Sequence, residues 1–292
     1  MMFLDSVQCI RNAENCLRSM DIDKIYLGDC LELMRGIPEG SVDMILADLP
    51  YSALNRNNKH VQWDRIIPFE PLWEQYLRIA KENAAIVLFC QGMFTAKLMM
   101  SQPKIWKYNL IWEKGRATGF LNANRMPMRS HEDIAVFYRK QPTYNPQWRT
   151  GDSHPQGNGI HKQTNQCYGE HKEVKRKVGA AYDYEHIKVV PPNGKCFPNS
   201  VLHFKKEHNA DTKHPTQKPV ELIRYLIRTY TNEGDLVLDN CVGSGTTAVA
   251  AIKEKRHFIG MELNKEYYDI ACKRIKKEQI EIKSSLFNNE YE

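Results

Sequence analysis

The most constraining feature of the sequence is a glycine turn that follows a short apolar run and precedes a helical segment. The run Leu236–Asp239 predicts a strand, Gly243 and Gly245 predict a tight turn, and a helix is expected over Thr246–Lys253. Glycine allows a tight turn and lets a ligand approach the main chain with no Cβ in the way. A helix start adds free N–H groups for an anionic group, and Glu262, at the end of the next predicted strand, can accept the hydroxyl hydrogens of a ribose. The turn therefore predicts a nucleoside-cofactor site.

The glycine pattern alone leaves the cofactor open. Gly-x-Gly-x-x-Ala is also a dinucleotide fingerprint, so NAD and S-adenosylmethionine are both compatible with it, and a turn that only packs a helix onto a sheet is the plainer alternative. Only one strand–helix unit clearly follows the turn. A dinucleotide fold needs more sheet downstream, which disfavours NAD unless the chain is permuted.

The rest of the chain alternates between predicted strands and helices. Strands are expected at residues 24–29, 42–47, 84–90, 108–113, 134–139 and 257–261, and helices at 30–37, 71–81, 220–230 and 265–282. This alternation predicts an α/β fold with a mostly parallel sheet. Periodicity fails from 141 to 200, which indicates an inserted functional segment or a disordered one. We therefore divide the chain into residues 1–140, the insert 141–200, and residues 201–292.

Composition excludes several classes of protein. With 42% hydrophobic and 26% charged residues among 292, the chain is neither disordered nor a coiled coil. No apolar run approaches the roughly 18 residues of a membrane span, and the first six residues lack a secretory pattern, so a cytoplasmic protein is expected. The net charge of +6 is compatible with a polyanionic partner. The spacing of His161, Cys167, His171 and Cys196 matches no common zinc pattern, so no metal is expected.

A second motif, Asp48-Leu49-Pro50-Tyr51, follows the apolar run 42–47. Open α/β sheets bind ligands at this end of their strands. Methylation of an aromatic amine requires acceptors for its two N–H groups, because the nitrogen must become more tetrahedral as it attacks. Asp48 and the Leu49 carbonyl can be those acceptors, Pro50 restricts the backbone, and Tyr51 can stack on an extruded base. An Asp-x-Pro turn with a core tyrosine is the structural alternative.

With these two motifs the chain resembles the amino-methyltransferases of restriction-modification systems and bacteriophages, which act on adenine N6 or cytosine N4. The order of motifs is similar to the beta class, in which the tetrad comes first, a target-recognition segment second and the S-adenosylmethionine turn last. The resemblance extends over residues 24–275. It implies a Rossmann-like S-adenosylmethionine-dependent methyltransferase fold, with a mostly parallel seven-stranded sheet and an inserted target-recognition region.

The resemblance also implies roles for individual residues. Asp48, Leu49, Pro50 and Tyr51 take the catalytic positions. The cofactor-binding positions come from four blocks of the chain, and they are Asp29, Thr216, Lys218, Asp239, Cys241, Gly243, Gly245, Thr246 and Glu262. The family usually has Asp-Pro-Pro-Tyr and Asp-Pro-Phe-x-Gly-x-Gly, whereas this chain has Leu49 in its tetrad and Asn240-Cys241 before its glycines. A cysteine covers a cofactor with less apolar area than phenylalanine.

The expected substrate is double-stranded DNA, because the tetrad precedes the glycine turn, unlike the order in protein-glutamine methylases. An initial Asp favours adenine over cytosine as the target. The insert 141–200 is the expected recognition segment, and residues 114–129, with Arg116, Arg125 and Arg129, form a second DNA-facing candidate. The family implies a possible homodimer and a possible cognate restriction endonuclease. Cytosine-N4 methylation, a nucleotide-dependent oxidoreductase and a non-catalytic DNA-binding protein remain the alternatives.

Overall fold

The computed structural model describes residues 20–51, 65–150, 195–205 and 217–289. The chain divides into two compact units, residues 1–145 with 200–292, and residues 146–199. We call them unit 1 and unit 2. Within the described residues, no helix combines the length and apolar character needed to cross a bilayer.

Unit 1 is built on an eight-stranded sheet with the strand order β1-β10-β9-β2-β3-β5-β4-β8. In that order the strands are β1 (Lys24–Leu27), β10 (His257–Glu262), β9 (Leu236–Asp239), β2 (Val42–Asp48), β3 (Ala80–Cys90), β5 (Arg129–Phe137), β4 (Trp106–Thr118) and β8 (Val201–His203). All neighbours are parallel except β5, which runs antiparallel to both β3 and β4.

The predicted mostly parallel α/β fold is confirmed, with one more strand than the seven expected. The additional strand β8 has three residues and pairs with Ile111, Trp112 and Glu113 at the edge of the sheet. Three residues are too few for an alternation of apolar and polar side chains to be recognised in the sequence. The hairpin strands β4 and β5 also extend beyond the expected ranges.

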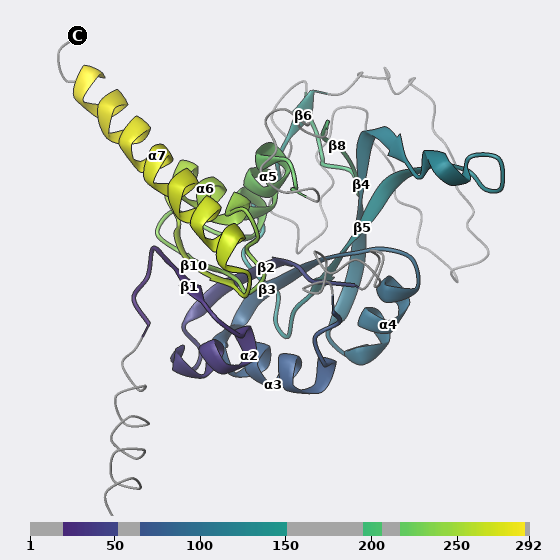
Figure 1. Cartoon of the computed structure of the whole chain (residues 1–292), viewed down its shortest axis with the longest axis horizontal. Helices are drawn as coiled ribbons and strands as arrows, with labels where there is room; N and C mark the ends of the chain where they lie inside the picture. Colours follow the sequence, from purple (N-terminus) through teal and green to yellow (C-terminus); the bar gives the residue numbers. More distant parts are fainter. Residues whose placement is uncertain (1–19, 52–64, 151–194, 206–216, 290–292) are drawn as a thin grey trace, which may run out of the picture. The chain divides into compact units, whose positions relative to one another are not determined.

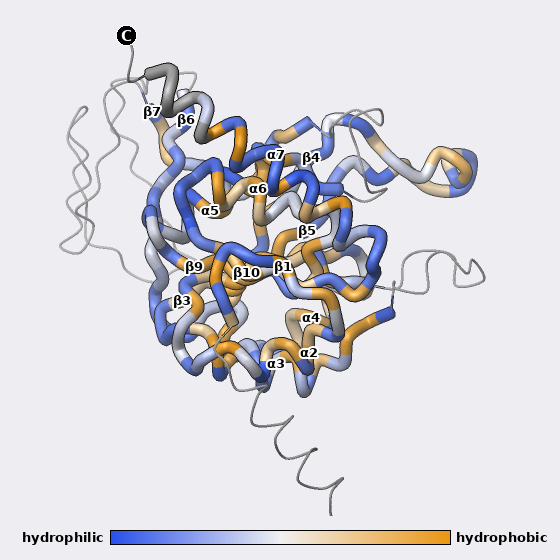
Figure 2. Tube along the Cα trace, turned by 60° about the vertical axis from the view of Figure 1, so that its left-hand side comes forward, coloured by the Kyte–Doolittle hydropathy of each residue, from blue (hydrophilic) through white to orange (hydrophobic). Residues whose placement is uncertain are grey.

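Helices cover both faces of this sheet (Figure 1). One face carries α5 (Val220–Tyr230), α6 (Thr246–Lys253) and α7 (Lys265–Asn289), and the other carries α2 (Cys30–Leu33), α3 (Phe69–Ile79) and α4 (Met93–Ser101). The buried side chains accordingly form two clusters, one on each face. Strand β2 shows the alternation, because Met44 and Leu46 belong to the first cluster while Ile45 and Ala47 belong to the second. Figure 2 shows hydrophobic colour around the central strands β9 and β10, in agreement with their buried side chains.

The two motif-bearing strands are neighbours at the centre of the sheet. β2 pairs with β9 through Met44↔Val237 and Ile45↔Leu238. Asp43 strengthens this junction, since its carboxylate accepts a hydrogen bond from the Leu236 N–H (3.0 Å) and pairs with Lys81 (2.6 Å). Because parallel strands end at the same edge, the tetrad after β2 and the glycine turn after β9 emerge side by side.

In unit 2 the described residues form a short two-stranded ribbon. β6 (Arg149–Thr150) runs antiparallel to β7 (Lys195–Cys196). The rings of Trp148 and Phe197 lie 5.0 Å apart, and the Arg149 side chain donates to the Phe197 carbonyl. The two ends of the segment between these strands are therefore held together.

Candidate active site

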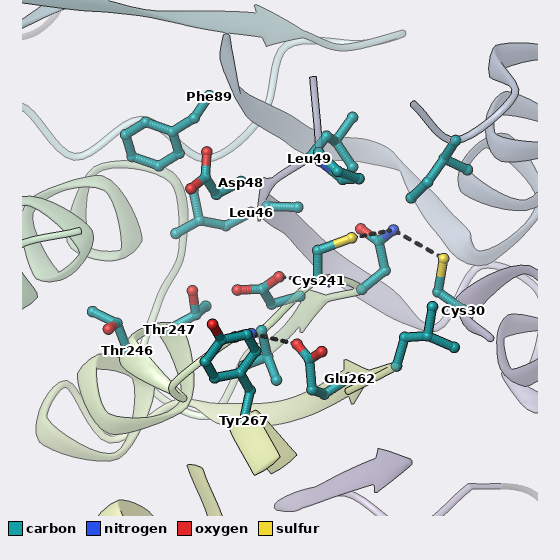
Figure 3. A pocket seen from close by; sticks show the side chains of 18 of the residues that line it. Cys30, Leu46, Asp48, Leu49, Phe89, Cys241, Thr246, Thr247, Glu262 and Tyr267 are labelled. Carbon is teal, nitrogen blue, oxygen red and sulfur yellow. Dashed lines mark hydrogen bonds between the residues drawn. The ribbon is translucent and has the colours of Figure 1, made fainter. Parts of the chain in front are cut away.

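A cavity of about 380 Å³ opens at the carboxyl ends of the central parallel strands in unit 1. This volume lies in the range of roughly 300–1,000 Å³ that small-molecule sites occupy. Its walls come from the residues that follow β1, β2, β9 and β10, with Lys218 and Tyr267 contributed by flanking segments. Figure 3 shows Asp48 near the Phe89 ring, and Glu262 with Tyr267 on another wall.

The glycine turn has the left-handed backbone that its sequence requires. Gly243 has a φ of 53° and Gly245 a φ of 87°, values that L-residues with a Cβ rarely adopt. An added Cβ at Gly243 would meet no protein atom within 4 Å, and Gly243 lines the cavity. A Cβ at Gly245 would lie 3.0 Å from the Ala271 Cβ of α7. The first glycine therefore keeps the cavity open, and the second allows α6 and α7 to pack closely.

Glu262, at the end of β10, holds the backbone of the glycine turn through its carboxylate. One of its oxygens accepts the Gly243 N–H at 2.9 Å and the other accepts the Asn264 N–H at 2.7 Å. Burial raises the pKa of Glu262, and these backbone hydrogen bonds offset part of that rise. The carboxylate thus lines the cavity while it orders both adjacent backbone segments.

Asp239 places a second carboxyl group at the floor of the cavity. It is buried, and one of its oxygens accepts the Cys241 N–H at 3.0 Å. Burial raises the pKa of Asp239 to about 7; hydrogen bonds from Thr247 and Cys241 lower it, and the charges of Asp48 and Glu262 add to the rise. With Asp29, Asp48 and Glu262, Asp239 makes four acidic side chains that line one cavity, an arrangement that favours a cationic ligand.

The tetrad aspartate belongs to a buried network of alternating charges. Lys218 Nζ lies 2.5 Å from Asp48 Oδ2 and 3.4 Å from Glu132 Oε2, and Lys114 Nζ lies 3.1 Å from Glu132 Oε1. The side chains of Lys218 and Lys114 are 6% and 4% exposed. Burial lowers the pKa of Lys218, but the charges of Asp48, Tyr51 and Glu132 and a hydrogen bond to Asp48 raise it by more. Lys218 therefore stays protonated and stabilises the negative charge of Asp48.

The other tetrad residues shape the wall next to Asp48. Leu49 is 2% exposed and belongs to the core, while Pro50 and Tyr51 also line the cavity. The Tyr51 ring packs against Phe94 with 5.4 Å between ring centroids. Burial raises the pKa of Tyr51, as does the charge of Asp48, so its hydroxyl stays protonated. The aromatic ring is thus held in place by the core before any ligand is present.

Asn240 and Cys241, which depart from the family pattern, form a polar cluster with Cys30. The Tyr76 hydroxyl hydrogen-bonds to Asn240 Oδ1 at 2.5 Å. Asn240 Nδ2 donates to Cys30 Sγ (3.4 Å) and Cys241 Sγ (3.6 Å), the two dashed lines that end at the labelled cysteines in Figure 3. Tyr76 and Asn240 are 0% and 2% exposed. The amide is therefore fully used in fixing both cysteines at the cavity wall.

Most of the predicted site residues meet at this cavity. Its lining includes Asp29, Asp48, Leu49, Pro50, Tyr51, Lys218, Asp239, Cys241, Gly243, Thr246 and Glu262. Gly245 is not part of the lining, and its role in the structure is the contact with Ala271. Thr216 lies outside the described residues, as do His161, Cys167 and His171.

Sequence reasoning did not identify four contributors to this site. Glu132 and Lys114 complete the charge network, and Lys114 is buried although we expected it to open an exposed loop. Phe89 lies under Lys218, with Nζ 5.0 Å from the ring centroid. Arg274 of α7 donates to the Ser244 carbonyl at 2.7 Å and so supports the glycine turn. None of these residues belongs to a local motif, so only the fold reveals them.

Comparison with known sequences places this geometry in a family. The profile of the DNA methylase family of the N6/N4 type matches residues 42–273. The DNA adenine methyltransferase YhdJ of Escherichia coli K12 is 27% identical over 275 residues, covering 86% of this chain and 82% of that protein. The type II methyltransferase M.BglII of Bacillus subtilis is also 27% identical, covering 86% of this chain and 68% of that protein.

Solved structures share the fold. The M1.HpyAVI–SAM complex aligns with a TM-score of 0.55 at 23% identity, over 86% of this chain and 98% of that one. The cytosine-N4-specific PvuII DNA methyltransferase aligns with a TM-score of 0.59 at 17% identity, over 88% of each chain. With the tetrad and the glycine turn at one cavity and a family match over most of its length, this chain belongs to the N6/N4 DNA methylase family.

Proposed function

We propose that this protein transfers a methyl group from S-adenosylmethionine to the N6 amine of an adenine that is flipped out of double-stranded DNA. The observation that carries the proposal is that Asp48 and the glycine turn, far apart in sequence, line one cavity. A methyl donor and an amine must be held within contact of each other for transfer to occur, and one cavity with both sets of residues provides that proximity.

The residues of the cavity suit S-adenosylmethionine. We assign Glu262 to the ribose hydroxyls and Asp29, the N-cap of α2, to the adenine end, because both side chains line the cavity. Asp239 provides negative charge for the cationic methionine end, and Gly243 leaves room for its close approach. The cofactor supplies a methyl group bonded to a positively charged sulfur. M1.HpyAVI, which has the same fold, was solved as a SAM complex.

The chain's own part in the reaction is to position the target amine. Asp48 and the Leu49 carbonyl accept the two N–H hydrogens, which favours a tetrahedral nitrogen whose lone pair points at the methyl group. A carboxylate has about four acceptor sites, so the hydrogen bond from Lys218 does not exhaust Asp48. The amine is the nucleophile, so a covalent intermediate with the protein is not required. Tyr51, packed against Phe94, holds the ring of the base.

Adenine is the favoured target because YhdJ is named a DNA adenine methyltransferase and because Asp48 begins the tetrad. Cytosine N4 is the second candidate, since the PvuII enzyme of the same fold is cytosine-N4-specific. The chemistry of the two amines is the same, and the shape of the base pocket decides between them.

We assign target recognition to the insert 141–200. The β6–β7 ribbon lies within this insert and pairs residues near its two ends. A homodimer and a cognate restriction endonuclease are further expectations, based on family resemblance and on type II relatives such as M.BglII. Sedimentation of the purified protein tests the first, and affinity purification from the native host tests the second.

The central experiment measures transfer of labelled methyl groups from S-adenosylmethionine to unmethylated genomic DNA. Methylation-sensitive long-read sequencing of DNA from an expressing host then gives the modified base and its sequence motif together. We expect N6-methyladenine at one short motif. Modified cytosine would favour the second candidate. No transfer by a protein that still binds DNA would favour a non-catalytic DNA-binding protein, and tight NADH binding in a fluorescence titration would favour an oxidoreductase.

A further inference from the structure

Strands β4 and β5 continue past the sheet as a hairpin that projects from the rest of unit 1 (Figure 1). We call residues 115–130 the arm. At its tip, Phe120–Asn122 form a single 3₁₀ turn after Gly119, whose φ is 95°. Backbone bonds from Asn122 to Gly119 (2.9 Å) and from Arg125 to Asn122 (2.8 Å) order this tip. The arm is therefore a structured projection.

The base of the arm lies next to the tetrad. Trp112 pairs with Glu132 and Glu113 pairs with His131 where the hairpin leaves the sheet. Glu132 contacts Lys218, which in turn pairs with Asp48. Gln91, after β3, supports this base because its amide bonds to the His131 carbonyl (3.2 Å) and accepts from Arg129 (3.0 Å). The base of the arm is therefore two ion-pair contacts away from Asp48.

The tip exposes large apolar side chains. Phe120 is 77% exposed and Leu121 is 96% exposed, and Met126 and Met128 are 58% and 38% exposed. Four exposed apolar residues within nine positions are a cluster, and clustered apolar exposure of this kind marks sites of interaction. The hydrogen-bonded turn orders the backbone that carries Phe120 and Leu121.

The charge of the arm identifies the partner. Arg116, Arg125 and Arg129 are exposed, and residues 115–130 contain no Asp or Glu. A surface that carries positive charge and no negative charge is suited to a polyanion, because its cations can neutralise phosphates. An apolar tip flanked by arginines is the combination that DNA-bending proteins use, in which cations hold phosphates and an apolar wedge enters the base stack.

We infer that the arm inserts Phe120 and Leu121 into the base stack beside the target nucleotide, while its arginines contact the flanking phosphates. This inference rests on the proposed function. From Glu113 to Thr118, strand β4 extends roughly 16 Å beyond the rim, which is enough to reach across a groove about 12 Å wide. Removing a base from the stack leaves a gap, and an apolar wedge in that gap stabilises the extruded state.

The test compares methyl transfer by three proteins on two duplexes that carry the motif found by sequencing. The proteins are the wild type, the double variant Phe120→Ser/Leu121→Ser, and the matched control Met100→Ser/Ile280→Ser, whose residues are 71% and 58% exposed outside the arm. One duplex is fully paired, and the other has an abasic site opposite the target base, which makes extrusion easier. We expect the arm variant to lose more than tenfold in single-turnover rate on the paired duplex and less than threefold on the abasic one. The control should match the wild type on both.

Other outcomes contradict the inference. An arm variant as active as the wild type on paired DNA would overturn it, and so would an equal loss on both duplexes, which would indicate simple docking. A shift from dimer to monomer on sedimentation of the arm variant would show that the tip covers a second copy of the chain. If the wild type methylates no DNA, the proposed function itself is wrong. This outcome is distinct from a loss of activity that is limited to the arm variant.

The arginines give an independent readout. Arg116→Gln/Arg125→Gln should reduce the slope of log affinity against log salt by about one for each phosphate that the variant no longer neutralises. Phe120→Ser/Leu121→Ser should leave that slope unchanged. An unchanged slope in the arginine variant would show that Arg116 and Arg125 do not contact phosphates.

Discussion

Lys218 Nζ lies 2.5 Å from Asp48 Oδ2, although the two residues are 170 positions apart in the chain. The resemblance to the family implied a cofactor-binding position for Lys218, whereas its side chain pairs with the aspartate of the tetrad. Since Glu132 binds the same ammonium group, the lysine joins the tetrad to the β4–β5 hairpin.

Asp48→Asn should reduce methyl transfer by a factor of about 10³, because an amide is a weaker acceptor for an amine that gains positive charge. The substitution preserves shape, so cofactor affinity should change less than fivefold. Single-turnover kinetics and calorimetric titration with S-adenosylmethionine measure the two quantities. A parallel loss of rate and affinity would show that Asp48 acts in cofactor binding instead.

Lys218→Met should reduce transfer at least a hundredfold and should also destabilise the fold, since two partly buried carboxylates lose a shared, buried cation. Breaking a buried pair in this way costs about 3–5 kcal/mol. Lys114→Met is the matched control, because Lys114 is equally buried and contacts Glu132 but not Asp48. It should lower the free energy of unfolding in urea similarly, with a much smaller loss of transfer. Equal kinetic losses in both variants would assign Lys218 a purely structural role.

The two glycines of the turn should respond differently to substitution. Gly243→Val places a side chain in the cavity and should weaken cofactor binding more than tenfold. Gly245→Ala places its Cβ about 3 Å from Ala271 and should mainly lower the melting temperature. Both variants also carry the strain of a left-handed backbone, about 1–2 kcal/mol. Affinity and melting temperature measured on both variants separate the roles, and the reverse pattern would contradict them.

Asp239 should make cofactor binding depend on pH. Its pKa of about 7 means that half of the free protein carries a neutral carboxyl group at neutral pH. A cationic ligand favours the ionised form, so affinity for S-adenosylmethionine should rise up to tenfold per pH unit below 7 and level off above it. Binding near pH 6 should release a proton, detectable by calorimetry in buffers of different ionisation enthalpy. Asp239→Asn should abolish this dependence; persistence in that variant would point to Glu262.

The same carboxyl group affects stability in the unliganded protein. An unfolded aspartate has a pKa near 4, and the folded value is raised, so the native state binds the proton more tightly. The contribution is therefore favourable below about pH 4 and is lost as pH rises through 7, by roughly 2–4 kcal/mol. Relative to wild type, Asp239→Asn should become more stable as pH increases from 4 to 7. Urea unfolding at several pH values checks this sign.

Much of the fold followed from local patterns. The glycine turn and the alternation of strands and helices were enough to predict a parallel α/β sheet, because each depends on neighbouring residues only. The tetrad lines the cavity because parallel strands end at a common edge, and its catalytic role stays a prediction. The strand β8 escaped prediction because three residues show no period.

The charge network could not have been predicted in the same way. Lys114 and Glu132 are single charges on adjacent strands, and a sequence gives no sign that such residues are buried rather than solvated. Gly245 looked like a ligand contact because it shares a motif with Gly243, but its neighbour Ala271 lies on a helix that the motif does not include. These roles depend on contacts between distant segments.

The adjacency of β2 and β9 has a consequence for synthesis. Their contact joins residues 193 positions apart, and β1 pairs with β10 across an even longer interval. While the chain emerges from the ribosome, β2 has β3 on one side but nothing on the other until the last quarter has been translated. The unpaired N–H and C=O groups of that edge can pair with strands of other chains. Contacts between residues so far apart in sequence also form slowly. Until β9 is available, the unpaired edge of β2 therefore favours association between nascent copies over correct pairing.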